Sequence, residues 1–553
     1  MKRRLLPVLL AGLLAGCAGL TPPPRGPVDV QILAINDFHG NLKPPVGGIK
    51  IADPKDKTKQ ISVPAGGSEH VATLLKELRA KHKNHIFVAA GDLIGASPLL
   101  SALFHDEPTV ESLSLMELEV TAVGNHEFDK GKDELLRMQQ GGCHPKDGCK
   151  GPHPFAGAKF QYLAASTVDT KSGKTIFPAY YVKQFDGLPV AFIGLTLQGT
   201  PAIVTPTGVE GLAFKDEAET VNTLVPVLRR QGIEAIVVLI HEGGFPTGDY
   251  NECPGLSGPI VDLVTKLDKA VDLVVSGHTH KAYNCVIDGR LVTSGDKYGT
   301  IVSEIDLKLD PKTRDVIEAR ANNVIARTDI YAKDPAQTTL IAAYEQLSAP
   351  LANRVVGRLA ATLTRDANPA GETVLGDLIA DAQLAATSAQ QDGGAVIAFM
   401  NPGGVRTDLI REDDGQLTYG DLFACQPFTN ALVTLTVSGE QLKLLLEQQW
   451  INQPKPRILH SSQGFTYAWD AARPGGDRVL TDSLKLNGQP IDPQASYRVT
   501  VNEFLAGGGD GFSALKEGKE RRFGMFDVDA LDVYIQAKSP LSPGQLDRIQ
   551  RVH

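Results

Sequence analysis

The stretch VDVQILAINDFHG, residues 28–40, decides the fold, because it joins a buried strand directly to residues that can bind a metal ion. Its first eight residues, Val28–Ile35, are mostly apolar, which is typical of a strand buried on both faces in an α/β sheet. Asp37 and His39 follow almost at once. Residues two apart in an extended segment project to the same side, so we expect both side chains to bind one ion.

The same arrangement of a strand followed by metal-binding residues recurs four times in the N-terminal half. The further apolar runs are His85–Ala90, Val120–Val123, Ala235–Ile240 and Val271–Val275. The polar residues that follow them include Asp92, Asn125-His126-Glu127-Phe128-Asp129, His241 and His278-Thr279-His280. Ligand sites in open α/β sheets gather at the carboxyl ends of strands, so we expect the five clusters to converge.

The rest of the chain divides into further units. At 553 residues it is too long for one hydrophobic core, so two domains are expected. Additional strands are predicted at Val190–Leu195 and Arg290–Ser294, and helices at Glu69–Lys81, Asp334–Asn353 and Val374–Ala386. The predicted units are a signal peptide (1–17), a Pro-rich tether (18–27), a first domain (28–330), a linker helix (334–353) and a second domain (355–553).

Composition narrows the class of ligand. With 42% hydrophobic and 22% charged residues, the chain reads as an ordinary globular protein, and its formal net charge of -9 argues against a nucleic-acid polymer as partner. A small anion remains compatible, because bound metal ions reverse the charge locally. The mixture of oxygen and imidazole ligands suits divalent ions of the Mn, Zn, Co or Fe class better than Mg or Ca. The oligomeric state is not indicated.

The first residues form a targeting segment. Lys2, Arg3 and Arg4 precede a short apolar run, Leu5–Ala15, which ends in the sequence Leu14-Ala15-Gly16-Cys17. That ending resembles the bacterial lipobox, which implies a lipid on Cys17; a plain signal peptide with an incidental cysteine is the alternative. We therefore expect an exported protein anchored in the cell envelope, on the periplasmic face of a bacterial membrane, which contacts that membrane only through its lipid.

The other five cysteines agree with export. We predict the disulfides Cys143-Cys149, within one loop, and Cys253-Cys285, with Cys425 left as a buried thiol. Zinc binding is the alternative, but the spacings lack a C-x₂-C pattern.

The ordered series D-x-H, G-D, G-N-H-E, H and G-H-x-H resembles the calcineurin-like metallophosphoesterases, and among them the 5′-nucleotidase family. The resemblance implies an N-terminal four-layer β-sandwich flanked by helices, plus a smaller α/β C-terminal domain on a linker helix. It also implies two ions. Asp37, His39 and His280 would hold one ion, Asn125, His241 and His278 the other, and Asp92 would bridge them. His126 would act on the phosphoryl group or the leaving group, steered by Asp129.

The C-terminal half carries four more motifs of that family: Gly376–Ala382, Asn401–Arg406, Pro427–Asn430 and Phe504–Phe512. They suit a nucleoside, because aromatic faces stack on any base and arginine binds phosphate through two hydrogen bonds. The substrate-binding residues that we predict are Phe428 and Phe504 for the base, Asp510 for the ribose, and Arg406, Asn401 and Arg365 near the phosphate. Where the family places several arginines before its helix signature, this chain has only Arg365.

The expected function is two-metal hydrolysis of nucleotide phosphoesters outside the cytoplasm, with a small-molecule nucleotide as substrate. A 5′-nucleotidase that also accepts UDP-sugars or dinucleotides fits this reading. A 2′,3′-cyclic-nucleotide phosphodiesterase with 3′-nucleotidase activity is the alternative. A thiosulfate-releasing sulfur-oxidation enzyme and a binding lipoprotein without activity fit less well, because the paired Phe side chains, Asp510 and His126 favour catalysis on a nucleoside.

Overall fold

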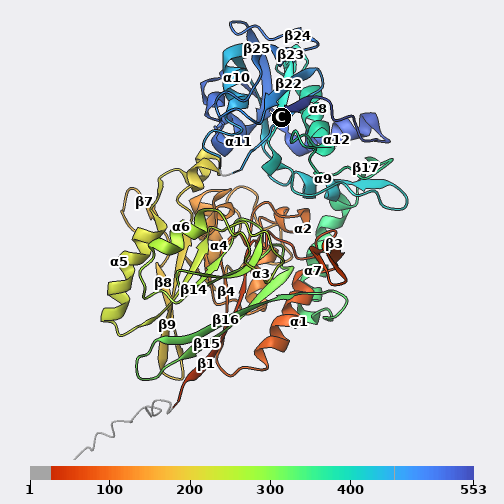
Figure 1. Cartoon of the computed structure of the whole chain (residues 1–553). Coiled ribbons are helices and arrows are strands. Elements are labelled where there is room, and N and C mark those ends of the chain that lie inside the picture. Colours follow the sequence, from red (N-terminus) through yellow and green to blue (C-terminus); the bar gives the residue numbers. More distant parts are fainter. Residues whose placement is uncertain (1–25, 454) are drawn as a thin grey trace, which may run out of the picture.

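The computed structural model describes residues 26–453 and 455–553. Two α/β domains lie one above the other and are joined by helix α7 (Pro335–Ala352), with the C-terminal domain at the top of Figure 1. The predicted lipid-bearing Cys17, the signal peptide and most of the tether lie outside the described residues. Within the described part, no helix is both long and apolar enough to cross a membrane.

Two six-stranded sheets form the centre of the N-terminal domain. The first has the order β16 (Val316–Ile325), β15 (Ile301–Leu309), β1 (Val28–Ile35), β4 (His85–Ala89), β5 (Val120–Ala122) and β6 (Gln161–Leu163). The second has the order β13 (Ala282–Ile287), β14 (Arg290–Gly295), β12 (Leu273–Ser276), β11 (Ala235–His241), β9 (Leu188–Thr196) and β8 (Tyr180–Phe185). Strands β1, β4 and β5 are parallel, as are β9, β11 and β12, so each sheet presents several carboxyl ends at one edge.

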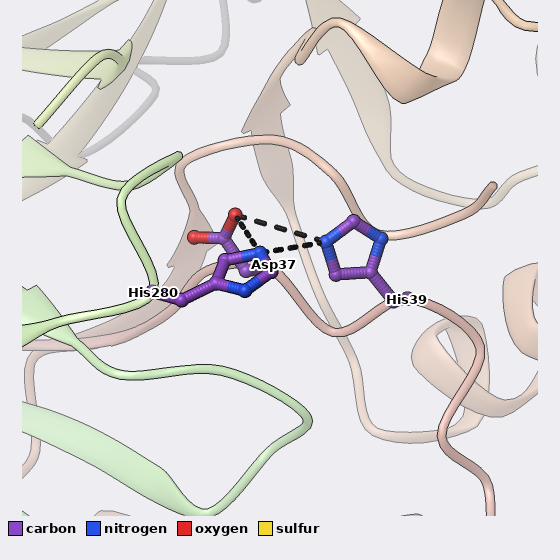
Figure 2. A group of neighbouring side chains, drawn as sticks. All are labelled: Asp37, His39 and His280. Atoms are coloured by element: carbon purple, nitrogen blue, oxygen red, sulfur yellow. Dashed lines mark hydrogen bonds and ion pairs between the residues drawn. The ribbon is translucent and has the colours of Figure 1, made fainter. Parts of the chain in front are cut away.

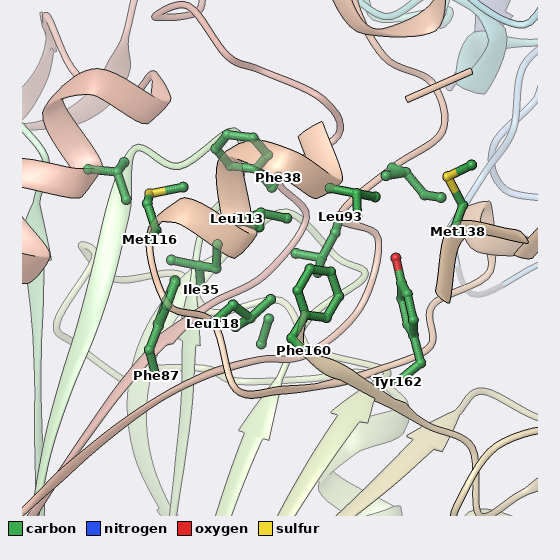
Figure 3. Close-up of a cluster of buried hydrophobic side chains, with 14 of the residues drawn as sticks. Ile35, Phe38, Phe87, Leu93, Leu113, Met116, Leu118, Met138, Phe160 and Tyr162 are labelled. Carbon is green, nitrogen blue, oxygen red and sulfur yellow. The ribbon is translucent and has the colours of Figure 1, made fainter. Parts of the chain in front are cut away.

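Alternate side chains of these strands bury different layers of the core. Ile32 of β1 faces the second sheet and packs in one cluster with Phe192 and Val237. The opposite face of β1 packs under α1 (Ser68–Arg79), α3 (Glu107–Leu115) and α4 (Lys132–Gln140), where Ile35, Phe87 and Leu113 meet (Figure 3). Helices α5 (Glu217–Arg230) and α6 (Pro259–Lys266) cover the outer face of the second sheet. The four layers predicted from the sequence are thus present.

The predicted elements appear close to their expected bounds. Strand β1 begins and ends where predicted, and α1, α7 and α8 (Val374–Thr387) shift by at most two residues. Strand β12 starts at Leu273, two residues later than expected. At this position the backbone N–H of Asp272 still donates to the Ile236 carbonyl at 3.0 Å, but the N–H of Ile236 donates to the Asp272 carboxylate at 2.8 Å, which replaces a backbone acceptor in the ladder.

Helix α7 connects the two domains. Asp334 caps its N-terminus by accepting the N–H groups of Ala336 and Gln337. Gln337 is buried against α3, where it accepts from the Ser112 hydroxyl at 2.7 Å. Further along, α7 contacts α9 (Tyr419–Cys425) of the C-terminal domain. One helix is therefore held by both domains.

The C-terminal domain is built on a five-stranded sheet in the order β21 (His460–Ser461), β18 (Ile397–Met400), β25 (Ser496–Asn502), β20 (Ala431–Ser438) and β26 (Lys519–Phe526). Helices α8 and α12 (Asp527–Lys538) pack with α9 in one apolar cluster. The other face of the sheet packs on α10 (Gly439–Glu447) and on β22 (Phe465–Asp470). Leu99 of the N-terminal α2 (Leu99–Ala102) joins the first of these clusters, so apolar packing crosses between the domains.

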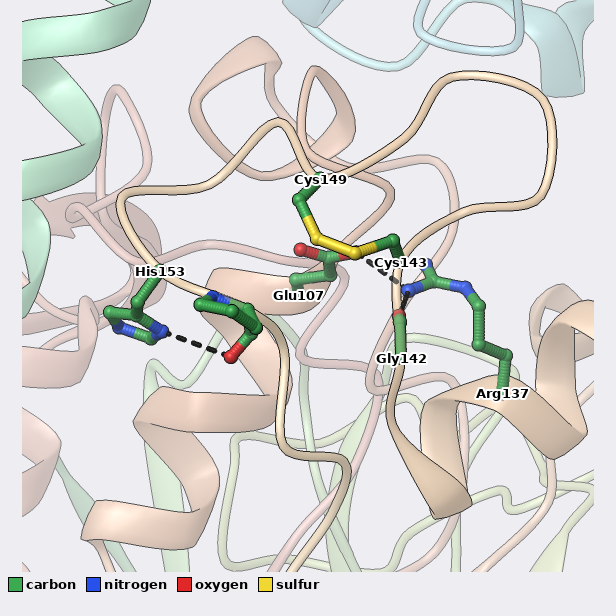
Figure 4. Close-up of a disulfide and its surroundings, with 7 residues drawn as sticks. Glu107, Arg137, Gly142, Cys143, Cys149 and His153 are labelled. Carbon is green, nitrogen blue, oxygen red and sulfur yellow. Dashed lines mark hydrogen bonds and ion pairs between the residues drawn. A yellow bond between two sulfur atoms is a disulfide. The ribbon is translucent and has the colours of Figure 1, made fainter.

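Both predicted disulfides are present, and Cys425 is a buried free thiol in α9. Cys143–Cys149 closes the loop that follows α4 (Figure 4). Beside it Arg137 donates to the Glu107 carboxylate and to the carbonyl of Gly142, both at 2.6 Å. This buried ion pair fixes the start of the loop.

Candidate metal centre and nucleotide cleft

Five strand ends converge at one edge of the two facing sheets, as the sequence predicts. Strands β1, β4 and β5 bring residues from the first sheet, and β11 and β12 bring residues from the second. The side chains that meet there are those of Asp37, His39, Asp92, Asn125, His126, His241, His278 and His280. Most of them are buried, which excludes bulk water from the cluster.

One half of the cluster consists of Asp37, His39 and His280, which point toward one another in Figure 2. The Nε2 atoms of the two histidines lie 3.1 Å apart, and His280 Nε2 lies 3.3 Å from Asp37 Oδ1. His39 Nε2 lies 3.8 Å from the same oxygen. Three ligand atoms thus face one point.

The other half consists of Asp92, His241, His278 and Asn125. His241 Nε2 lies 2.9 Å from Asp92 Oδ2, and the ligand atoms of Asp92, His241 and His278 all lie within 4.8 Å of one another. His39 Nε2 is 3.7 Å from Asp92 Oδ2, so Asp92 lies between the two halves. Asn125 Oδ1 is buried without a hydrogen-bond partner among the described residues, which fits its predicted role as a metal ligand.

The ionisation of the imidazoles also fits metal binding. Burial lowers the pKa of His278 to about 4 and the pKa of His39 well below its ordinary value, so both rings are neutral and carry a free lone pair. For His241, burial acts against the charge, but Asp92 and Asp37 raise its pKa to about 10. The buried carboxylates of Asp37 and Asp92 thus favour positive charge between them, and bound divalent ions would supply it.

The backbone at the ligands differs from the sequence expectation. Asp37 and His39 are not in an extended segment: both have left-handed φ angles, of 49° and 45°. Asp92, His278 and His280 share this conformation, so five of the seven predicted ligands are left-handed. Asp and His tolerate that region better than most residues, at a cost of about 1–3 kcal/mol each. Their side chains converge because tight turns follow the strands, and not because residues alternate along them.

Two glycines permit these turns. Gly91 has φ of 82°, and a Cβ there would lie 2.9 Å from His241 Nδ1 and 2.7 Å from the backbone nitrogen of Gly124. A Cβ on Gly124 would lie 2.2 Å from Asp92 Oδ1. Any side chain at either position would displace the ligands.

Sequence reasoning missed Glu127, which positions the turns. Its buried carboxylate accepts backbone N–H groups from Asp92 at 3.0 Å, Leu93 at 2.8 Å and Gly124 at 2.6 Å. Burial, and then the charge of Asp92, raise the pKa of Glu127 to about 7. The only available signal was its place inside the cluster of residues 124–129.

His126 and Asp129 meet as predicted in the turn after β5. His126 Nδ1 lies 2.8 Å from Asp129 Oδ2, and the backbone N–H of His126 donates to Asp92 Oδ1 at 2.9 Å. The residues three apart meet because a short 3₁₀ turn, His126–Phe128, follows the strand. This leaves the far nitrogen of the ring facing the cluster, where the His39 ring lies 5.1 Å away.

The C-terminal domain faces the metal centre through Arg406 and Phe428. The Phe428 ring stacks on His126 with centroids 5.6 Å apart, and the Arg406 guanidinium lies 5.8 Å from the Phe428 centroid. Nε and Nη2 of Arg406 are buried without a hydrogen-bond partner among the described residues. A guanidinium with two open donors beside a metal centre suits a phosphoryl group.

The remaining predicted substrate residues divide into two places. Asn401 donates to Asp510 Oδ2 at 2.9 Å, and the Phe504 ring lies directly over Gly509, next to Asp510. Arg365, in contrast, donates from Nε to Asp408 Oδ1 at 2.9 Å. Its role in phosphate binding stays a prediction. Among the described aromatic contacts none joins Phe428 to Phe504, so the two rings do not touch.

Comparison with known proteins places this geometry in a family. The endonuclease YhcR of Bacillus subtilis is 34% identical over 87% of this chain, which spans 37% of that longer protein. The cell wall protein Lmo0130 of Listeria monocytogenes is 32% identical over 92% of this chain and 68% of its own length. Residues 30–282 match the calcineurin-like phosphoesterase family, and residues 355–517 match the 5′-nucleotidase C-terminal domain. The chain belongs to the 5′-nucleotidase family.

A solved 5′-nucleotidase structure superposes on nearly the whole chain. The 5′-nucleotidase precursor of Thermus thermophilus is 27% identical, with a TM-score of 0.78 over 95% of this chain and 99% of the other. The predicted family and fold class are therefore confirmed.

Proposed function

We propose that this 5′-nucleotidase family member hydrolyses the 5′-phosphoester of nucleotides, with UDP-sugars and dinucleotides as further substrates. The observation that carries the proposal is the convergence of the metal-binding side chains on Asp92, opposite an arginine with open donors. The relatives named 5′-nucleotidase in Vibrio cholerae and trifunctional nucleotide phosphoesterase in Bacillus subtilis support a nucleotide as substrate.

The donor set fits two divalent ions of the Mn, Zn, Co or Fe class. Asp37, His39 and His280 would hold one, Asn125, His241 and His278 the other, with Asp92 shared. When bound, such ions polarise a phosphoryl oxygen and favour deprotonation of a water molecule at neutral pH.

The chain's own residues do the remaining work. Arg406 binds the phosphoryl oxygens through Nε and Nη2, and Phe428, Phe504 and Asp510 hold the base and the ribose. His126 carries a proton on the ring nitrogen that faces the cluster and gives it to the leaving 5′ oxygen, while Asp129 stabilises the charged ring. Burial lowers the pKa of His126, but Asp129 and Asp92 outweigh it and raise that pKa.

We also propose that the protein acts outside the cytoplasm, anchored by lipid on Cys17. Two disulfides support export, because such bonds persist in oxidising compartments.

The function is tested by phosphate release from 5′-AMP, 3′-AMP, cyclic 2′,3′-AMP and UDP-glucose, with added Mn²⁺ and with a chelator. We expect hydrolysis of 5′-AMP with Mn²⁺ and its loss with the chelator. Asp92→Asn should lower bound metal from two ions per chain to one or none. If the protein binds two ions but releases phosphate from none of the four substrates, the proposal is wrong. If it prefers the cyclic or 3′ substrate, the cyclic-nucleotide phosphodiesterase with 3′-nucleotidase activity replaces the proposed function.

A further inference from the structure

The ribose-binding Asp510 has an arginine beside it. Asp510 is 7% exposed and has a left-handed φ of 58°. Asn401 donates to one of its carboxylate oxygens, and the guanidinium of Arg457 forms an ion pair with the other. Gln453 Nε2 donates to the Asp510 carbonyl at 2.6 Å. The carboxylate is thus held firmly with a cation at one side.

The ion pair leaves part of the Arg457 guanidinium available to a ligand. The side chain is 29% exposed, and among the described residues its guanidinium pairs only with the Asp510 carboxylate. Burial lowers the pKa of Arg457, because the guanidinium is partly removed from water. An arginine offers five N–H donors, which leaves several free for a ligand.

The segment that carries Arg457 reaches the N-terminal domain. Lys455 Nζ lies 3.3 Å from the ring centroid of Phe245, four residues after the predicted metal ligand His241. Burial and the nearby charge of Lys281 lower the pKa of Lys455, and Lys281 directly follows the ligand His280. The segment that follows Gln453 thus brings a second cation, Lys455, into contact with the N-terminal domain near Lys281.

The chemistry of the ribose edge explains what this pair of charges would recognise. A free 2′,3′-diol needs two acceptor oxygens, and a lone carboxylate supplies them. A ribose whose 3′ oxygen carries a phosphate needs one acceptor for the 2′ hydroxyl and a cationic donor for the phosphate. Asp510 and Arg457 supply that combination, and charge-assisted arginine–phosphate hydrogen bonds are among the strong ones.

We propose that Arg457 recognises a second phosphate, on the 3′ oxygen of the ribose, while Asp510 accepts from the 2′ hydroxyl; this rests on the proposed nucleotide hydrolysis. The preferred substrate class is then a ribonucleotide with phosphate at both 5′ and 3′ positions. Water oxygen bonds to the 5′ phosphorus, the bond from phosphorus to the 5′ oxygen breaks, and that oxygen takes a proton. The products are orthophosphate and the nucleoside 3′-phosphate.

The test compares kcat/KM for 5′-AMP and adenosine 3′,5′-bisphosphate in the Mn²⁺-loaded protein. We expect the wild type to prefer the bisphosphate at least tenfold. Arg457→Gln should remove that preference, Arg457→Lys should keep part of it, and Arg521→Gln, on the exposed β26, should keep all of it. A preference that survives Arg457→Gln, or a wild type without one, would overturn the proposal.

Failure of the proposed function gives a different result. If neither ligand is hydrolysed, calorimetric affinities of the same two ligands for the same variants decide the role of Arg457.

A free bisphosphate and the 5′ end of an RNA both carry phosphate at the 5′ and 3′ positions of one ribose. The dinucleotide pApA distinguishes these two sources. Turnover of pApA with the same dependence on Arg457 would identify an RNA end, whereas its refusal would identify the small bisphosphate.

Discussion

At the scale of single residues, His126 differs from its neighbours in what holds its ring. Nδ1 of His39 and of His241 each contacts a backbone carbonyl, at 2.9 and 2.8 Å, which requires the proton on Nδ1 and leaves Nε2 free for an ion. Nδ1 of His126 contacts the Asp129 carboxylate instead. A carboxylate stabilises a charged ring, so the same residue type is set up as a ligand in two places and as an acid in the third.

His126→Ala is therefore expected to lower kcat by about 10²- to 10⁴-fold while the protein keeps its metal ions. The measurement is kcat for 5′-AMP together with metal content by elemental analysis. His82→Ala, on the surface of the same domain, is the matched control. Near-normal activity with full metal content would contradict the assignment of His126, whereas loss of metal would make it a ligand.

Substitution of Glu127 tests whether the turns that carry the metal ligands need its carboxylate as a hydrogen-bond acceptor. Glu127→Gln keeps the shape but leaves one acceptor oxygen and a buried NH₂ group facing backbone N–H donors. We expect metal affinity to fall about 10- to 100-fold, as for other groups that orient ligands. Titration with Mn²⁺ measures it, and the exposed Glu117→Gln serves as control. Unchanged affinity would mean that the backbone holds the turns alone.

The ligands could be predicted because an Asp or His directly after an apolar run is a local pattern. Their left-handed backbone could not, since nothing in the residues around Asp37 separates a turn from an extended segment. The acceptor role of Glu127 and the pairing of Arg457 with Asp510 also escaped prediction, because both depend on partners far away in the sequence.

At the scale of elements, the buried strands were predictable because each must be apolar on both faces, and periodicity revealed α1 and α7. The exposed strand β26 had no such signal: all eight of its residues are exposed. Helix α12 begins next to it with Asp527, whose backbone N–H donates to Asn430 beside the Phe428 platform. This hydrogen bond joins the start of α12 to the loop of Phe428, which we propose binds the base.

The buried carboxyl of Asp527 leads us to expect that the stability of the fold depends on pH. Burial raises its pKa from an ordinary 3.8 to about 7. Between these values the folded protein holds a proton that the unfolded chain has lost, so stability falls as the pH rises and levels off above about 7. Asp527→Asn removes this loss. Melting temperatures at pH 5 and pH 8 should differ less in the variant than in the wild type. Equal pH dependence in both would show that Asp527 does not titrate in this range.

At the scale of the whole molecule, the structure shows the two domains in contact beside the candidate metal centre. Phe428 of one domain stacks on His126 of the other, and Leu99 crosses between their cores. A base held between Phe428 and Phe504 needs a gap of about 7 Å, twice the usual contact distance of carbon atoms. We expect the ring pairing of Phe428 with His126 to change when a nucleotide binds. Helix α7, packed on both domains, is the connection about which they would turn.

Spin labels on Val286→Cys and Val533→Cys test this motion. Both positions are exposed, at 72% and 59%, one on β13 and the other on α12, while Cys425 is buried and the disulfides do not react. We expect the distance distribution to shift when adenosine and orthophosphate bind to the Mn²⁺-loaded protein, because ligands select among existing domain arrangements. Phe428→Ala, which removes the ring pair with His126, should shift the ligand-free distribution by itself. One narrow peak, identical in every sample, would mean that the domains are rigid and that the substrate enters by side-chain rotation alone.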